Sequence, residues 1–168
     1  MDDFEIISLT PDDWQQYKAL RLEALQHDPS AFGSTYAEKV DQSEEYWREG
    51  LTTSKGMKLF ARVDGGLVGM AGSFYEQDGQ GTDVARIINV YVKPDYRGRG
   101  ISRALIERLL ELIRQEKKVA TALLEVYQNS AAAIATYKKL GFKENGSFPD
   151  FVASDGRHIP YYRMTLKL

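Results

Sequence analysis

Residues 97–102, Arg-Gly-Arg-Gly-Ile-Ser, are the part of this sequence best suited to hold a ligand. They follow a strand-like run at 84–92 and begin an amphipathic helix expected at about 101–116. The first N–H groups of a helix have no partner within it and lie at the positive end of the helix dipole. Two glycines let an anion approach the backbone, and Arg97 and Arg99 add donors in a planar fork. The sequence therefore predicts a seat for phosphate, and hence a phosphorylated cofactor.

A turn of this kind has other uses. It would also suit the phosphates of ATP or NAD in a nucleotide-binding regulator, or it would merely cap a helix at the surface. The Gly-x-Ser-x-Gly motif of hydrolases and the Walker phosphate loop are both missing from the sequence. The choice among these uses depends on the rest of the chain.

The totals of the chain describe an ordinary globular protein. Its 168 residues are expected to form one domain over residues 1–168, and 43% of them are apolar. A net charge of −2 argues against a nucleic-acid partner, and no apolar run reaches the roughly 20 residues of a membrane helix. With no cysteine and two histidines, we expect neither a thiolate nucleophile nor a metal site. The acidic start lacks the features of a secretory signal, so a cytoplasmic location is expected.

The elements that would position the turn follow from hydrophobic spacing and turn residues. Strands are expected at 4–9, 57–63, 67–75, 84–92, 121–127, 142–148 and 157–168, and helices at 11–27, 42–53, 101–116 and 129–140. Residues 30–41 are expected to form a loop. This order predicts an α/β (α+β) fold with a mixed, mostly antiparallel central sheet flanked by helices. The strands at 84–92 and 121–127, joined through a helix, should be parallel.

Two segments resemble motifs of the GCN5-related N-acetyltransferase (GNAT) family. Residues 88–102 are similar to its acyl-CoA-binding motif, Arg/Gln-x-x-Gly-x-Gly/Ala. About thirty residues on, the run from Glu125 through Ala133 and Tyr137 to Leu140-Gly141-Phe142 resembles its second motif, a strand leading to an Asn-x-x-Ala-x-x-x-Tyr helix. The order of elements over nearly the whole chain fits the acyl-CoA N-acyltransferase fold of this family.

The sequence departs from the family pattern at two points. Ser102 stands where the family has Gly or Ala. Ser130 stands seven residues before Tyr137, where the family commonly has asparagine, and Asn129 lies one position earlier. Either Asn129 or Ser130 would then fill the asparagine's role.

The resemblance implies acetyl-CoA as cosubstrate. Its pyrophosphate would lie on the N–H groups of residues 98–103, and its pantetheine arm would pair like an added strand along residues 90–92. An N–H near Val90 or Tyr91 would polarise the thioester carbonyl. The implied cofactor-binding residues are Val90, Tyr91, Val92, Arg97, Gly98, Arg99, Gly100, Ile101, Ser102, Arg103, Asn129, Ser130 and Tyr137.

The resemblance also implies direct attack of a primary amine on the thioester. Tyr137 would be the general acid that protonates the departing thiolate, although an aromatic residue at this spacing would also suit a core. The base is left open among Glu76, Asp83, Glu125 and His158. The family often has an acid on the strand before the turn, where this chain reads Arg-Ile-Ile-Asn at residues 86–89.

The expected activity is acetyl transfer to an amine whose identity is open: a small amine, a polyamine, an antibiotic, an amino-acid derivative, or a protein or peptide amine. Aromatic and acidic residues in the loops near 27–36, 75–83 and 148–158 would suit a cationic amine. The alternative is a non-catalytic acyl-CoA-binding sensor or scaffold. A homodimer formed by sheet extension through residues 161–164 is a further expectation.

Overall fold

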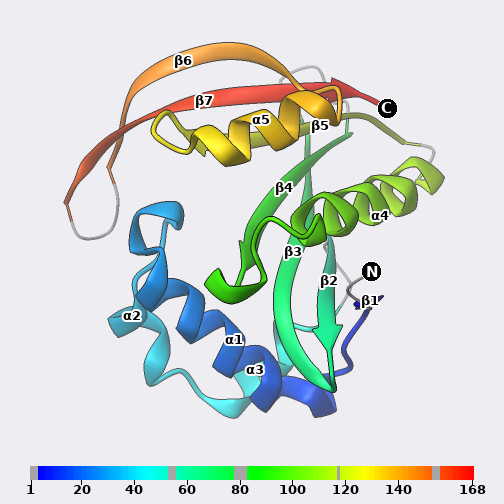
Figure 1. Ribbon diagram of the computed structural model, residues 1–168, viewed down its shortest axis with the longest axis vertical. Helices are drawn as coiled ribbons and strands as arrows, with labels where there is room; N and C mark the ends of the chain where they lie inside the picture. Colours follow the sequence, from blue (N-terminus) through cyan, green and yellow to red (C-terminus); the bar gives the residue numbers. More distant parts are fainter. Residues whose placement is uncertain (1–3, 53–55, 78–82, 117, 153–155) are drawn as a thin grey trace.

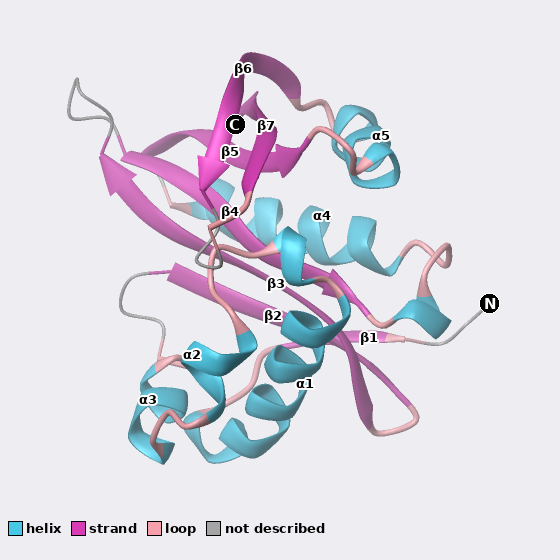
Figure 2. Ribbon diagram, turned by 90° about the vertical axis from the view of Figure 1, so that its left-hand side faces the viewer, coloured by secondary structure: helices cyan, strands magenta, loops and turns pink. Residues whose placement is uncertain are grey.

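A seven-stranded mixed sheet is the centre of the computed structural model, which describes residues 4–52, 56–77, 83–116, 118–152 and 156–168 (Figures 1 and 2). Every neighbouring pair of strands is antiparallel except β4 and β5. The expected mixed, mostly antiparallel sheet and its one parallel pair are therefore confirmed. The strand order is β1 (Glu5–Ile7), β2 (Gly56–Val63), β3 (Gly66–Gln77), β4 (Asp83–Val92), β5 (Val119–Tyr127), β7 (His158–Lys167) and β6 (Lys143–Val152).

Helices cover both faces of the sheet (Figure 2). On one face, apolar residues of α4 (Ile101–Gln115) and α5 (Ala131–Lys139) pack against the strands in a single core. On the other face, α1 (Trp14–His27), α2 (Tyr36–Val40) and α3 (Glu44–Glu49) contribute to a second core. Three short 3₁₀ turns, η1 (Pro11–Asp13), η2 (Pro29–Ala31) and η3 (Pro94–Tyr96), join the elements.

The prediction of a continuous loop at residues 30–41 is wrong, because η2 and α2 fall in this segment. Thr35 and Glu38 start α2 with a reciprocal capping box: the Thr35 N–H donates to the Glu38 carboxylate at 2.7 Å, and the Glu38 N–H donates to Thr35 Oγ1 at 3.4 Å. This pairing satisfies two N–H groups that a short helix would otherwise leave without partners. The helix expected at 42–53 is also shorter, since α3 ends before Gly50.

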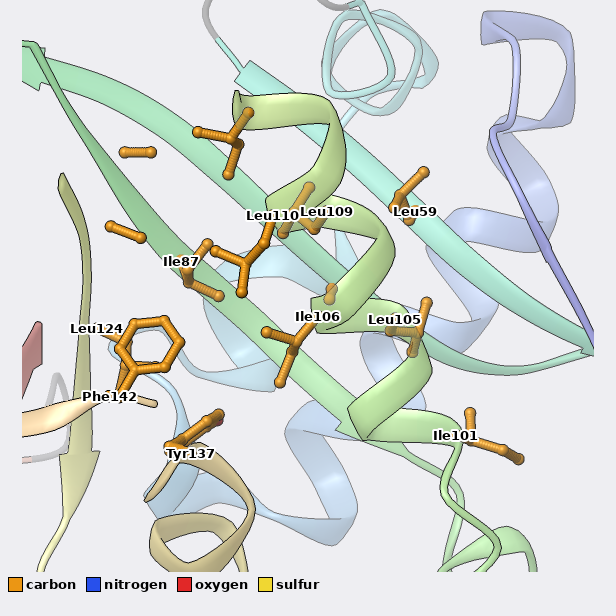
Figure 3. Packing of buried hydrophobic residues seen from close by; sticks show 14 of the residues in the cluster. Leu59, Ile87, Ile101, Leu105, Ile106, Leu109, Leu110, Leu124, Tyr137 and Phe142 are labelled. Carbon is orange, nitrogen blue, oxygen red and sulfur yellow. The ribbon is translucent and has the colours of Figure 1, made fainter. Parts of the chain in front are cut away.

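Helix α4 presents one apolar side to the sheet (Figure 3). Ile101, Leu105 and Leu109 are fully or almost fully buried on it, at the spacing of one helical face. At the far end of this core, Tyr137 of α5 lies beside Phe142, with their ring centroids 6.1 Å apart (Figure 3). The core therefore fixes the start of α4 and the position of α5 against the same strands.

Strand β4 carries an extra residue at its centre. Ile88 pairs with Gly72 and Tyr91 pairs with Met70, so two residues, Asn89 and Val90, stand opposite one residue of β3. Asn89 has a φ of +55°, which asparagine tolerates better than most residues. Such a bulge bends and twists a strand. Consistent with this, β4 pairs with β5 only over its first residues, up to Arg86, and the strands diverge beyond it.

The expected route to a dimer does not fit this topology. Residues 161–164 belong to β7, which lies inside the sheet between β5 and β6 and hydrogen-bonds to both. They therefore have no edge to offer to a second chain, and the edges of the sheet in the described residues are β1 and β6.

Among the helices that the structure describes, none combines the length and the apolar character needed to cross a bilayer.

Candidate functional site

A pocket of about 320 Å³ lies where β4 and β5 diverge. Its wall is formed by the two strands, by the chain around η2 and by α5. The lining residues are Ala31, Phe32, Gly33, Arg86, Ile87, Ile88, Asn89, Val90, Leu124, Glu125, Val126, Tyr127, Ser130, Ala133, Tyr137 and Tyr161.

The pocket reaches both faces of the sheet. Consecutive residues of each strand line it, and consecutive strand residues point to opposite faces. Phe32 belongs to the core on the α1 side, whereas Tyr137 belongs to the core on the α4 side. A ligand entering beside η2 could therefore meet one entering beside α5 between the strands.

The glycine turn at the start of α4 has the geometry of an anion seat. Gly98 and Gly100 have φ values of +78° and +81°, and a Cβ added to either would meet no atom within 4 Å. Gly100 caps α4 with no side-chain hydrogen bond, and the Ala104 N–H donates to its carbonyl at 3.0 Å. The N–H groups of the preceding residues of the first helical turn point out of the helix end. An anion could therefore reach them over both glycines.

The arginines of the turn are engaged within the protein. Arg97 donates through Nε to the carbonyl of Val92 at 2.9 Å and pairs through Nη2 with Asp28. Arg99 donates to the carbonyl of Asp95 at 3.1 Å, and its guanidinium lies 5.1 Å from the centre of the Tyr96 ring. Each guanidinium carries five N–H donors, so these contacts leave the role of Arg97 and Arg99 in binding an anion as a prediction.

Residues 90–92 face the divergence of the strands. Tyr91 and Val92 pair with β3 on one side, while the pairing of β4 with β5 ends at Arg86. The far edge of this segment is therefore available to an extended ligand. Tyr91 itself is buried on the α1 side, where its hydroxyl donates to Glu23 at 3.2 Å.

Tyr137 both packs in a core and lines the pocket. Only 8% of its surface is exposed, and its ring packs edge-on against Phe142. Burial raises the pKa of the Tyr137 phenol to about 12, because the charged phenolate is disfavoured away from water. The hydroxyl therefore stays protonated at neutral pH and can donate to a group in the pocket.

Asn129 and Ser130 are the two candidates for the role of the asparagine in the second family motif, and Ser130 is the one that lines the pocket. It precedes α5, lines the wall, and accepts the Ile134 N–H on its carbonyl at 3.0 Å. Asn129 is exposed and does not line the wall.

Of the four base candidates, all within the described residues, only Glu125 lines this pocket. Its Oε1 atom lies 3.1 Å from Arg86 and 3.0 Å from Arg163. Glu76 also pairs with Arg86, at 2.8 Å, and lines a second pocket of about 200 Å³ together with Asp83. His158 is exposed at the start of β7.

Several residues of the pocket wall were not predicted as site residues. Tyr127 and Tyr161 stand opposite one another on β5 and β7, and Ala31 adds to the wall from η2. Tyr127 was detectable, since a residue two positions after Glu125 shares its face of the strand. Tyr161 was not, because its position depends on the pairing of β7 with β5.

Parts of the expected acceptor loops lie outside the described residues. This is true of Asp78 and Asp155, and the side chains at 148–151 are likewise not described. Of the aromatic residues expected there, Phe32 lines the pocket, whereas Tyr75 lines the second one.

Comparison with known proteins agrees with this geometry. Residues 14–142 match the family model described as the acetyltransferase (GNAT) family. A stretch of 62 residues, 37% of this chain, is 47% identical to the [ribosomal protein bS18]-alanine N-acetyltransferase of Escherichia coli K12, and the match spans 41% of that relative's length. The L-amino acid N-acetyltransferase AaaT of the same organism is 27% identical over 151 residues, 89% of this chain and 91% of that protein. The structure of YncA from Salmonella typhimurium with acetyl-CoA superposes with a TM-score of 0.81 at 20% identity, over 99% of this chain and 94% of that one.

Proposed function

Because the chain belongs to the GNAT family of acetyltransferases, we propose that it transfers the acetyl group of acetyl-CoA to a primary amine, which attacks the thioester while both substrates are bound. The observation that carries this proposal is the pocket between the diverging strands, with Tyr137 in its wall. A pocket that opens on both faces suits a reaction between two separate substrates. The names of the relatives, all N-acetyltransferases, support the same reaction class.

The cosubstrate is proposed to lie along β4. Its pyrophosphate would be held by the N–H groups of residues 98–103, and its pantetheine arm would pair with the edge of residues 90–92. An N–H of Val90 or Tyr91 would then donate to the thioester carbonyl and stabilise the oxyanion of the tetrahedral intermediate. On the far side of the gap, Ser130 is the proposed contact from α5.

The chemical step needs two proton transfers. As the new C–N bond forms and the C–S bond breaks, Tyr137 would protonate the thiolate, and the amine would give up a proton. We propose Glu125 as the group that accepts it. Both of its arginine contacts fall on Oε1, so Oε2 would be the oxygen that accepts the proton. Arg86 in the wall would assist, since a nearby positive charge favours the neutral amine.

The test is release of free CoA from acetyl-CoA by the purified protein across a panel of amines. Tyr137→Phe should lower kcat by about 100-fold, the scale of a lost general acid, and leave the KM for acetyl-CoA unchanged. Tyr46→Phe is the matched control, because Tyr46 is exposed on α3 away from the pocket. Equal turnover by Tyr137→Phe and the wild-type protein would remove Tyr137 from the acid role.

A non-catalytic acyl-CoA sensor is the second candidate. One observation favours it: two of the carboxylates that could serve as bases, Glu76 and Glu125, are already paired with arginine. Tight binding of acetyl-CoA by calorimetry, with no CoA release from any amine, would select the sensor over the enzyme.

The remaining expectations belong to the same proposal. A cytoplasmic location fits a protein that uses acetyl-CoA, a metabolite of that compartment. The net charge of −2 suits a small-molecule or peptide amine better than nucleic acid. A homodimer, if formed through the sheet, would use β1 or β6, the strands with an unpaired edge.

A further inference from the structure

Arg21 is a buried cation on the inner side of α1. Only 7% of its surface is exposed, and its guanidinium lies 4.4 Å from the centre of the Phe32 ring. Nη2 donates to Ser34 Oγ at 3.1 Å, but the buried Nη1 has no hydrogen-bond partner among the described residues. A guanidinium stays charged in proteins, and buried charges are usually paired. This donor could therefore take a partner from outside the chain.

Lys58 of β2 adds a second cation nearby. It is half-buried, and in the described part of the chain no carboxylate lies within ion-pair distance of Lys58 or Arg21. The pKa of Lys58 is lowered first by burial and then by the positive charge of Arg21. The two cations therefore repel one another, and no acid of the described residues lies close enough to form an ion pair with either.

Both cations adjoin the α1-side opening of the pocket. A Cβ built on Gly72 would lie 3.5 Å from Lys58 Cγ and 3.8 Å from Ile88 Cγ1, so Lys58 and Ile88 flank the same glycine. Ile88 and Phe32 are part of the pocket wall. Lys58 thus lies one side chain from the pocket across β3, and Arg21 lies one side chain from it behind Phe32.

The acids of this region serve other cations. Glu125 contacts Arg86 and Arg163, and Glu76 contacts Arg86. Within the described residues, the opening at which an amine would enter therefore carries positive charge that these two carboxylates do not neutralise. A polycation such as spermidine would be repelled there, whereas an anionic group would be attracted.

We propose that Arg21 and Lys58 bind a carboxylate carried by the acceptor, so that the acetylated molecule is a small amine with an acid group near it, such as a free amino acid. This inference rests on the proposed function, because it names the acceptor class of the same site. Lys58 makes the direct contact, and Nη1 of Arg21 reaches the carboxylate when the Phe32 ring turns aside. Binding the acid end in this way directs the amine toward the gap between β4 and β5.

The first experiment compares free amino acids with their carboxamides, which have nearly the same shape but lack the negative charge of the carboxylate. Both CoA release and calorimetric binding in the presence of CoA are measured, with spermidine as a cationic acceptor. The acids should be bound and acetylated at least tenfold better than the amides or spermidine. Lys58→Met should remove this preference by raising KM for the acid while leaving KM for acetyl-CoA unchanged. Lys18→Met, which removes a cation elsewhere on α1, should change neither.

The outcomes separate this inference from the proposed function. Charge-dependent binding without turnover would support the carboxylate site and refute the enzyme. Turnover with equal use of acids and amides, or with Lys58→Met no different from Lys18→Met, would refute the carboxylate site and leave the enzyme intact.

Arg21 has its own test. Arg21→Met should lose the preference for acids with little change in Tm, because removing the unpartnered Nη1 offsets the loss of the Nη2 hydrogen bond to Ser34. Arg21→Lys, which keeps the charge, should retain part of the preference. A Tm that falls in both variants, with the preference for acids unchanged, would make Arg21 structural and overturn its role in binding.

Discussion

Gly98→Ala is the sharpest test of the anion seat, because the chain offers a matched control. Gly98 and Gly65 have nearly equal φ values, +78° and +80°, and a Cβ on either would meet no atom within 4 Å. Gly65 lies in the turn between β2 and β3, away from the pocket. The two substitutions therefore impose the same backbone strain and no clash. They differ in that Gly98, unlike Gly65, borders the proposed phosphate site at the start of α4.

The expected loss of stability follows from this geometry. An alanine held in the left-handed region costs about 1–2 kcal/mol. The smaller entropy of the unfolded alanine chain offsets about 0.4–1 kcal/mol of this. Each variant should therefore lose about 1 kcal/mol, a drop of roughly 2–4 °C in Tm for a domain of this size.

The binding effect should fall on one variant only. The methyl group of Gly98→Ala would occupy the space over the N–H groups, and the Kd for acetyl-CoA, measured by calorimetry, should rise at least tenfold, or about 1.4 kcal/mol. Gly65→Ala should bind acetyl-CoA like the wild-type protein. Unchanged affinity in Gly98→Ala, or an equal loss in Gly65→Ala, would refute the assignment of the turn as the phosphate seat.

Three further outcomes are expected. The folded protein holds the Tyr137 proton more tightly than the unfolded chain, because folding raises the pKa of the phenol from 10.0 to about 12. The stability that this proton contributes is complete below pH 10 and falls by up to about 1.4 kcal/mol per pH unit toward pH 12, so the Tm of Tyr137→Phe should fall less steeply at alkaline pH than that of the wild-type protein. Glu125→Gln should lower kcat by about 100-fold if Oε2 of Glu125 takes the proton of the amine, as measured across a pH–rate profile. A decrease in kcat of less than threefold would mean that Glu125 only holds Arg86 and Arg163 in place. Leu109→Ala, at a fully buried position of α4, should cost about 2–5 kcal/mol in urea unfolding, and Leu112→Ala on the same helix, only partly buried, should cost less than half of that.

Local spacing in the sequence was enough to find α4 and the glycine turn. The apolar stripe through Leu105 and Leu109 predicted the helix, which the structure ends one residue before the expected position. The parallel pairing of β4 with β5 also followed, because a helical connection between two strands of one sheet favours it. These features could be predicted because they depend on residue spacing within one element, or on the general rule that a strand–helix–strand crossover within a sheet joins parallel strands.

The divergence of the strands, which the family resemblance implies, does not follow from local spacing. The bulge at Asn89 carries no glycine, and its effect depends on how β4 pairs with β3. The position of Arg21 did leave a signal. Tyr17, Arg21 and Ala24 recur at helical spacing on the buried side of α1, so a charged residue interrupts an apolar stripe. Its unpaired Nη1, however, depends on the fold of residues 32–34 around it.

Helix α2, which was not predicted from the sequence, follows η2 and fixes the end of the segment between them. Residues 28–33 are held at one end by the pairing of Asp28 with Arg97 and at the other by the capped start of α2. Arg97 belongs to the turn proposed to hold the cosubstrate, whereas Phe32 forms part of the wall at the amine entrance.

Access to the pocket from both faces of the sheet predicts the kinetic order of the proposed reaction. An amine arriving beside η2 and a thioester arriving beside α5 would not obstruct one another, so neither has to be first. Initial-rate plots should then intersect, with either product acting as a competitive inhibitor of its own parent substrate. A compound that joins a carboxylated amine to CoA would thread the sheet from one surface to the other.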